Sequence, residues 1–73
     1  MPGRLGSVKP KEFIRKLGKL GFRVDHQSGS HVVLIKPGGP RLVVPYHARE
    51  MKRGLLAALL KQAGISPDEF RAL

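Results

Sequence analysis

Residues 22–46, FRVDHQSGSHVVLIKPGGPRLVVPY, decide the fold of this 73-residue chain. Val, Ile and Leu dominate three short runs in this stretch, and Gly-containing segments at 28–30 and 37–40 separate them. Runs of this kind bounded by turn residues are typical of β-strands, and connections this short join antiparallel neighbours. The stretch therefore predicts three antiparallel strands over 22–27, 31–36 and 41–45.

The glycines also predict how these strands pair. Turns centred on them place His31 opposite both His26 and Tyr46, and Val33 opposite both Val24 and Val44. Because side chains alternate between the two faces of a sheet, this register assigns one set of residues to the core. The predicted core face consists of Phe22, Val24, His26, His31, Val33, Ile35, Leu42, Val44 and Tyr46.

Apolar residues recur at helical spacing on both sides of the strands. One helix is predicted to begin at Pro10 and to end before Gly21, and a second is predicted over 52–63 with Gly64 at its end. Ser66 and Glu69 have the spacing of a capping box, which predicts a short terminal helix. The predicted apolar stripes are Phe13, Ile14, Leu17 and Leu20 in the first helix, Leu55, Leu56, Leu59, Leu60 and Ala63 in the second, and Phe70 and Leu73 in the third.

The resulting fold class is α+β, with the order α-β-β-β-α(-α) and a three-stranded antiparallel sheet packed on helices. Residues 1–7 lack periodicity and are predicted to form a flexible arm, and residues 8–73 are predicted to form a single small domain. No run of apolar residues approaches the roughly 18 that a membrane span needs. Cysteine is absent, which suits a reducing compartment. We therefore expect a soluble, cytoplasmic protein that does not enter a membrane.

Charge is the most informative property of the composition. Fourteen Lys and Arg residues oppose five Asp and Glu residues, a formal net charge of +9. Such an excess favours a polyanionic partner, of which nucleic acid is the commonest. The alternative is that the surplus serves solubility alone.

Three histidines, His26, His31 and His47, are the candidates for proton transfer near neutral pH. His31 begins the second predicted strand directly after the Gly29 turn, and the predicted register brings His47 near it. RNA cleavage needs a base for the 2′-hydroxyl, an acid for the leaving 5′-oxygen and cations for the phosphorane charge. A structural, hydrogen-bonding role remains open for each imidazole. No spacing matches a known zinc-ligand pattern, so we expect no metal site and no cofactor.

Aromatic residues make up 5% of the chain and Trp is absent, which argues against an extended stacking surface for single strands. The order of helix, antiparallel sheet and helix, together with the basic composition, is similar to double-stranded-RNA-binding domains. Those domains read the phosphate backbone and the 2′-hydroxyls. A non-catalytic module of that kind is therefore an alternative to a nuclease, and a basic adaptor for another protein is a third possibility.

Several short motifs in the chain follow one another in a family-specific order. These are Gly21-Phe22, Gln27, Gly29-Ser30-His31, Val44-Pro45 with His47, and residues 60–65, LKQAGI. In order and spacing they resemble the HicA (YcfA-like) toxins of bacterial toxin–antitoxin systems. Two positions depart from that pattern, because His26 stands where the family commonly has Arg, and Leu55 where it usually has Thr.

This resemblance implies an mRNA interferase, a metal-independent endoribonuclease connected with stress responses and neutralised by a HicB-type antitoxin. It implies no small-molecule substrate. The histidine of the Gly-Ser-His motif, His31, would be catalytic, with His47 as a possible second catalytic residue. The residues expected to contact RNA are Lys9, Lys11, Arg15, Lys16, Lys19, His26, Gln27, Ser30, Lys52 and Arg53.

Overall fold

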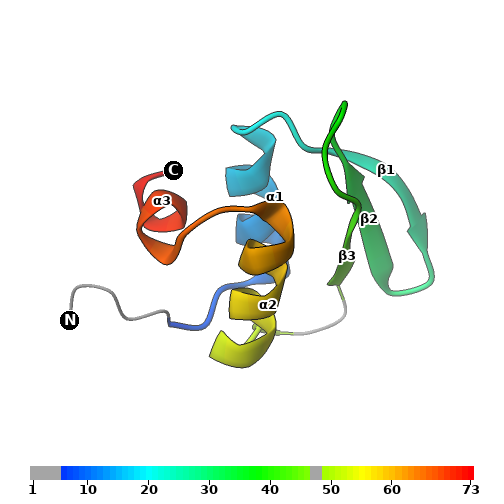
Figure 1. Cartoon of the computed structure of the whole chain (residues 1–73). Helices are drawn as coiled ribbons and strands as arrows, with labels where there is room; N and C mark the ends of the chain where they lie inside the picture. Colours follow the sequence, from blue (N-terminus) through cyan, green and yellow to red (C-terminus); the bar gives the residue numbers. More distant parts are fainter. Residues whose placement is uncertain (1–5, 47–48) are drawn as a thin grey trace.

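The computed structural model describes residues 6–46 and 49–73. The elements follow in the order α1 (Pro10–Gly18), β1 (Arg23–Ser28), β2 (His31–Ile35), β3 (Leu42–Pro45), α2 (Arg53–Ala63) and α3 (Pro67–Ala72). In Figure 1, α1 and α2 stand between the sheet on one side and α3 on the other. The predicted α+β class and the predicted order of elements are confirmed.

The sheet is antiparallel, in the order β1-β2-β3. A two-residue turn, Gly29 and Ser30, joins β1 to β2 and is closed by the pair Ser28 and His31. Gly29 has a φ of +59°, as a two-residue turn with glycine at its first central position requires. A β-bulge shifts the register of β1 between Val24 and His26, so Asp25 has no direct partner on β2.

The predicted strand register is wrong. Val33 pairs with His26 and Val43, whereas the sequence suggested Val24 and Val44 as its partners. All four residues from Val32 to Ile35 are apolar, so hydrophobic alternation alone does not distinguish the two faces of β2. The β2–β3 pairing differs from the predicted one by one residue, and a step of one residue is enough to move a strand's side chains to the other face.

The predicted core face changes accordingly. Val32 and Leu34 of β2 join Leu42 and Val44 of β3 in the core. The residues predicted to share that face, Val24, His26, His31 and Tyr46, are exposed, and Ile35 is half-buried. Inward-facing His26 and His31 would have had to bury imidazoles, whereas the observed register buries only aliphatic side chains. Val33 is also buried, in the middle of the central strand on the opposite face.

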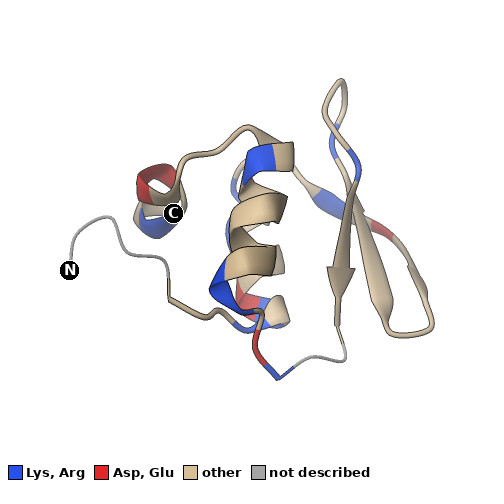
Figure 2. Cartoon of the chain, turned by 60° about the horizontal axis from the view of Figure 1, so that its bottom comes forward, with Lys and Arg blue, Asp and Glu red and all other residues tan. Residues whose placement is uncertain are grey.

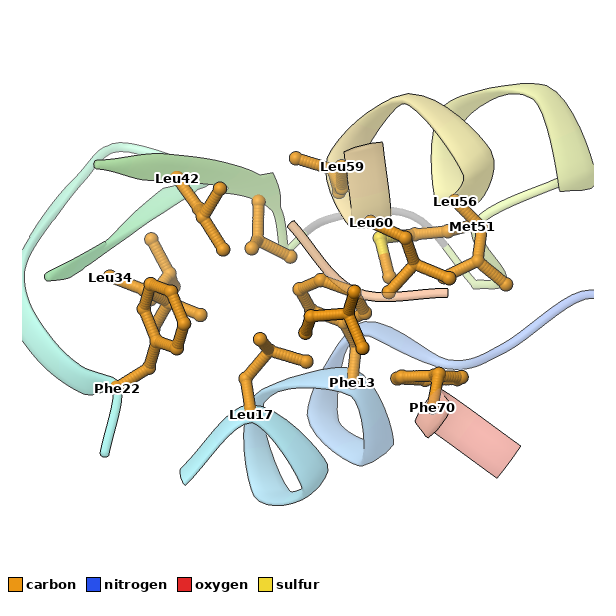
Figure 3. Packing of buried hydrophobic residues seen from close by; sticks show 13 residues of the cluster. Phe13, Leu17, Phe22, Leu34, Leu42, Met51, Leu56, Leu59, Leu60 and Phe70 are labelled. Carbon is orange, nitrogen blue, oxygen red and sulfur yellow. The ribbon is translucent and has the colours of Figure 1, made fainter. Parts of the chain in front are cut away.

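One hydrophobic cluster holds the sheet and the three helices together (Figure 3). Phe13 and Leu17 of α1 lie at its centre. The centroid of the Phe13 ring is 5.6 Å from the centroid of the Phe70 ring in α3. This contact attaches α3 to the helix that also covers the sheet. The cluster comprises Phe13, Leu17, Phe22, Val32, Leu34, Leu42, Val44, Met51, Leu56, Leu59, Leu60, Ile65 and Phe70.

The end of α2 and the start of α3 follow their sequence signals, whereas α1 ends at Gly18, earlier than the predicted end before Gly21. Gly64 ends α2 in the left-handed conformation with a φ of +75°. Ser66 and Glu69 form the predicted capping box of α3, with reciprocal hydrogen bonds of 3.1 and 2.9 Å. One stripe residue was predicted wrongly, because Leu55 is 40% exposed. Leu56, Leu59 and Leu60, at spacings of three and four residues, already fill the buried face of α2.

The observed register predicts effects of different size for the same substitution at two neighbouring positions of β3. Val44 is fully buried and Val43 is 43% exposed. Val44→Thr should lower the free energy of unfolding by about 1–3 kcal/mol, because it buries a hydroxyl group. Val43→Thr should change it by less than about 0.5 kcal/mol. Urea denaturation of both variants checks this, and equal losses would contradict the register.

Candidate active site

His31 lies at the end of the sheet formed by the β1–β2 turn. It is the first residue of β2 and pairs with Ser28 on one side and Pro45 on the other. Its neighbour Val32 belongs to the core, so His31 lies on the face of the sheet that points away from the helices. The imidazole is exposed there. A side chain at this position is open to a large ligand.

Hydrogen bonds hold the turn that carries His31 from both sides. The Gln27 side chain donates from Nε2 to the Gly29 carbonyl oxygen at 3.0 Å. The Tyr46 backbone N–H donates to the Ser30 carbonyl oxygen at 2.7 Å. These contacts link the turn to β1 and to the end of β3, so His31 starts from a fixed backbone position.

His26 lies on the same face of the sheet as His31, the face that points away from the helices. It pairs with Val33, two positions along the ladder from the pair of Ser28 and His31. Such diagonal neighbours on one face lie about 7–8 Å apart, and their Cβ atoms are somewhat closer. The Asp25 carboxylate lies 2.7 Å from His26 Nδ1, and this contact orients the imidazole. His47, the other predicted catalytic residue, lies outside the residues that the structure describes.

Three parts of the chain that carry predicted RNA contacts lie toward the same end of the molecule. Figure 1 shows the β1–β2 turn and the N-terminal ends of α1 and α2 at the same end. Val8 and Met51, just before the two helices, form an antiparallel bridge with backbone hydrogen bonds of 3.1 and 2.7 Å. We call this region, made of the β1–β2 turn and the starts of α1 and α2, the hairpin end.

The five predicted cations of α1 do not share one location. Lys9 and Lys11 lie at the start of the helix and therefore at the hairpin end. Lys19 lies just past the other end of the helix. Eight residues at about 1.5 Å each separate Lys11 from Lys19, or about 12 Å along the axis.

Two further α1 cations interact with partners inside the chain. Arg15 donates to the Glu12 carboxylate, with Nε 3.0 Å from Oε1. This hydrogen bond lowers the pKa of Glu12 below its usual value and raises the pKa of Arg15. Lys16 extends toward α3, where its Nζ donates to the Phe70 carbonyl oxygen at 3.3 Å and lies 4.6 Å from the centre of the Phe70 ring.

The start of α2 adds positive charge at the hairpin end. Lys52 is the N-cap residue and Arg53 begins the helix, whose first turn contains no acidic residue. Neither N-cap residue, Lys9 of α1 or Lys52 of α2, caps its helix through its own side chain. In Figure 2 blue segments occupy both ends of α2 and the middle of the helix is tan.

Sequence reasoning missed one feature of this region, a pocket of about 220 Å³ between α1 and the β1–β2 hairpin. Val24 and Tyr46, both predicted to lie in the core, are 51% and 39% exposed. The available signal was Tyr46 itself, the only tyrosine, placed at the end of a predicted strand. The pocket is lined by Lys11, Ile14, Val24, Gln27, Val32 and Tyr46.

Within residues 6–46 and 49–73, no three His, Asp or Glu side chains come together in a way that could hold a metal ion. In the same ranges, no helix has the length and apolar character needed to cross a membrane.

The comparison with protein families gives one match. Residues 10–65 match the family described as the HicA toxin of bacterial toxin–antitoxin systems. No curated protein matches the sequence. The matched range begins at the first residue of α1 and ends just after α2, so it includes the whole sheet and the β1–β2 turn. The chain therefore belongs to the HicA toxin family.

Proposed function

We propose that this toxin is an endoribonuclease that binds and cleaves mRNA in the bacterial cytoplasm, with His31 as a catalytic residue. The observation that carries the proposal is the location of His31. It is exposed at the hairpin end, where the starts of α1 and α2 contribute Lys9, Lys11, Lys52 and Arg53. RNA cleavage requires an acid–base group and cations, and His31 lies toward the same end of the molecule as these cations.

The chemistry is an internal transfer of the phosphoryl group. A base removes the proton of the ribose 2′-hydroxyl, and the 2′-oxygen attacks the adjacent phosphorus. The bond to the 5′-oxygen breaks, and an acid protonates that oxygen as it leaves. The products are a 2′,3′-cyclic phosphate and a free 5′-hydroxyl, and no metal ion or cofactor is needed for the balance of atoms.

His31 fills one of the two proton-transfer roles in this proposal. His26 is placed to fill the other, because it lies on the same sheet face and Asp25 holds its Nδ1. The Nε2 atom of His26 is then left to exchange a proton with substrate. His47 remains the second candidate from the sequence.

Phosphate contacts at the hairpin end would position the RNA. The first backbone N–H groups of a helix have no partners within the helix and form an anion site together with the helix dipole. Two such helix starts, each with a basic N-cap residue, lie at this end. The same feature supports the alternative function, a double-stranded-RNA-binding module without catalysis, since it does not involve His31.

Membership of the HicA family implies an antitoxin partner. We propose an acidic, HicB-type protein that covers the hairpin end. With a net charge of +9, the chain attracts acidic surfaces as well as RNA. A partner at this position would exclude RNA from His31 directly.

His31→Ala should lower the cleavage rate by about 10²–10⁴-fold, the usual effect of losing a general acid or base. RNA affinity and thermal stability should stay close to wild type, because the side chain is exposed. Cleavage assays with and without EDTA, melting curves and RNA titrations measure the three properties. His26→Ala tests the second proton-transfer role, since it removes the other imidazole on the same face. Normal cleavage by His31→Ala would exclude a catalytic role for this residue, and unfolding would make its role structural.

Lys11→Ala and Lys19→Ala remove the same charge from opposite ends of α1 and form a matched pair. Lys11→Ala should weaken RNA binding and reduce the slope of log affinity against log salt by about 0.7–0.9, the change expected for one lost phosphate contact. Lys19→Ala should leave the slope unchanged. Binding titrations at several salt concentrations test this, and equal effects would indicate a diffuse electrostatic attraction with no defined RNA surface.

A HicB-type antitoxin should raise the melting temperature of the toxin and block RNA cleavage. A ligand that binds only the folded state at 100 times its dissociation constant stabilises that state by about 2.7 kcal/mol. Calorimetry and a cleavage assay across a titration with the antitoxin measure the two effects. An antitoxin that stabilises the toxin while cleavage continues would show that it binds elsewhere.

A further inference from the structure

The pocket between α1 and the β1–β2 hairpin is lined by apolar, aromatic, amide and charged side chains, the kinds of group that bind a nucleobase and its phosphate. Ile14, Val24 and Val32 supply apolar walls, and Tyr46 supplies an aromatic ring. Gln27 supplies an amide group, and Lys11 supplies a positive charge. The described part of the chain leaves this surface open, since Val24 is 51% and Tyr46 39% exposed.

The pocket is tied to the candidate active site through shared residues. Gln27 lines the pocket and also donates to Gly29 in the turn before His31. Tyr46 lines the pocket and its backbone N–H donates to Ser30, the residue directly before His31. A ligand in the pocket therefore contacts the two residues that hold the turn of His31.

The hydrogen bond from Gln27 to Gly29 also orients the amide group. A glutamine amide has two N–H donors and one acceptor oxygen, and this bond uses one donor. The remaining donor and acceptor form the pair that base edges match with two hydrogen bonds. Such an arrangement suits a planar, polar-edged ligand better than an aliphatic side chain.

The size of the pocket restricts the occupant. At about 220 Å³ it is smaller than the roughly 300–1,000 Å³ of sites for drug-sized ligands. Proteins that recognise RNA sequence take up unpaired bases, stack them on aromatic rings and hydrogen-bond their edges. A paired base inside a duplex cannot enter such a pocket.

We propose that this pocket binds the base of one unpaired RNA nucleotide, with Tyr46 stacking on the base, Gln27 hydrogen-bonding its edge and Lys11 facing the attached phosphate. The proposal rests on the proposed function in taking RNA as the ligand, and it adds a base-binding subsite to the cleavage site. A single base needs a single ring, so the low aromatic content of the chain does not oppose it.

Intrinsic fluorescence tests the proposal directly, because Tyr46 is the only tyrosine and the chain has no tryptophan. The full chain is titrated with a short 2′-O-methyl RNA, in which the attacking hydroxyl is blocked and cleavage cannot occur. The unpaired RNA should quench the fluorescence of Tyr46, and a duplex of the same sequence should not. Binding of unpaired RNA without quenching, or equal quenching by the duplex, would overturn the proposal.

Variants provide a second, independent measurement with labelled 2′-O-methyl RNA. Tyr46→Leu should weaken binding of unpaired RNA by about 5- to 100-fold, as expected for one lost stacking contact, and Tyr46→Phe should retain it. Val24→Phe should weaken binding by filling the pocket. Val43→Phe is its matched control, because Val43 is similarly exposed but lies on the opposite face of the sheet. Gln27→Ala should reduce any preference among four RNAs that differ at one base.

The outcomes separate this proposal from the proposed nuclease function. If the wild-type protein cleaves RNA while the Tyr46 and Val24 variants bind as tightly as wild type, the base pocket is wrong and the nuclease function stands. If wild type does not cleave but unpaired RNA quenches Tyr46, the pocket stands and the nuclease function fails. If only an antitoxin, and no RNA, quenches Tyr46, the occupant is a protein side chain and the proposal is overturned.

Discussion

The two-residue turn at Gly29 and Ser30 is the constraint on which the rest of the structure depends. Its pairing of Ser28 with His31 sets the register of the β1–β2 hairpin. Because side chains alternate along a strand, this register turns Val32 and Leu34 toward the helices and His26 and His31 away from them. A shift of one residue in this pairing would place His26 and His31 on opposite faces of the sheet. The same turn therefore determines both the core and the candidate active site.

The apolar and the charged side chains of the helices lie in different places. Phe13 and Leu17 anchor α1 in the core, and its cations either pair within the chain, as Arg15 and Lys16 do, or lie near its ends. The backbone bridge between Val8 and Met51 brings the starts of α1 and α2 together, which concentrates positive charge at the hairpin end. Every residue of β1 remains exposed, so this edge of the sheet is accessible beside the pocket.

Local signals in the sequence predicted most elements and few of their contacts. Helical spacing, Gly64 and the capping box at Ser66 were sufficient for the three helices, the end of α2 and the start of α3, and Gly29 predicted that His31 follows a turn. The register was not predictable, because all four residues from Val32 to Ile35 are apolar. The bond from Lys16 to Phe70, 54 residues apart, and the pocket between α1 and β1 depend on tertiary packing that no local pattern encodes. Glu12 and Arg15, three residues apart on a helix, could have been paired from spacing alone.

We propose that RNA binds at the hairpin end. The most direct test of this binding site is a titration with uncleavable 2′-O-methyl RNA in which amide chemical shifts are measured. The account predicts the largest changes in three segments, at residues 27–31, in the first turn of α1 and in the first turn of α2. It predicts little change in α3 or in the β2–β3 turn at residues 36–41, although that turn begins with Lys36 and ends with Arg41. Shifts concentrated in residues 36–41 or in α3, with residues 27–31 unaffected, would contradict it.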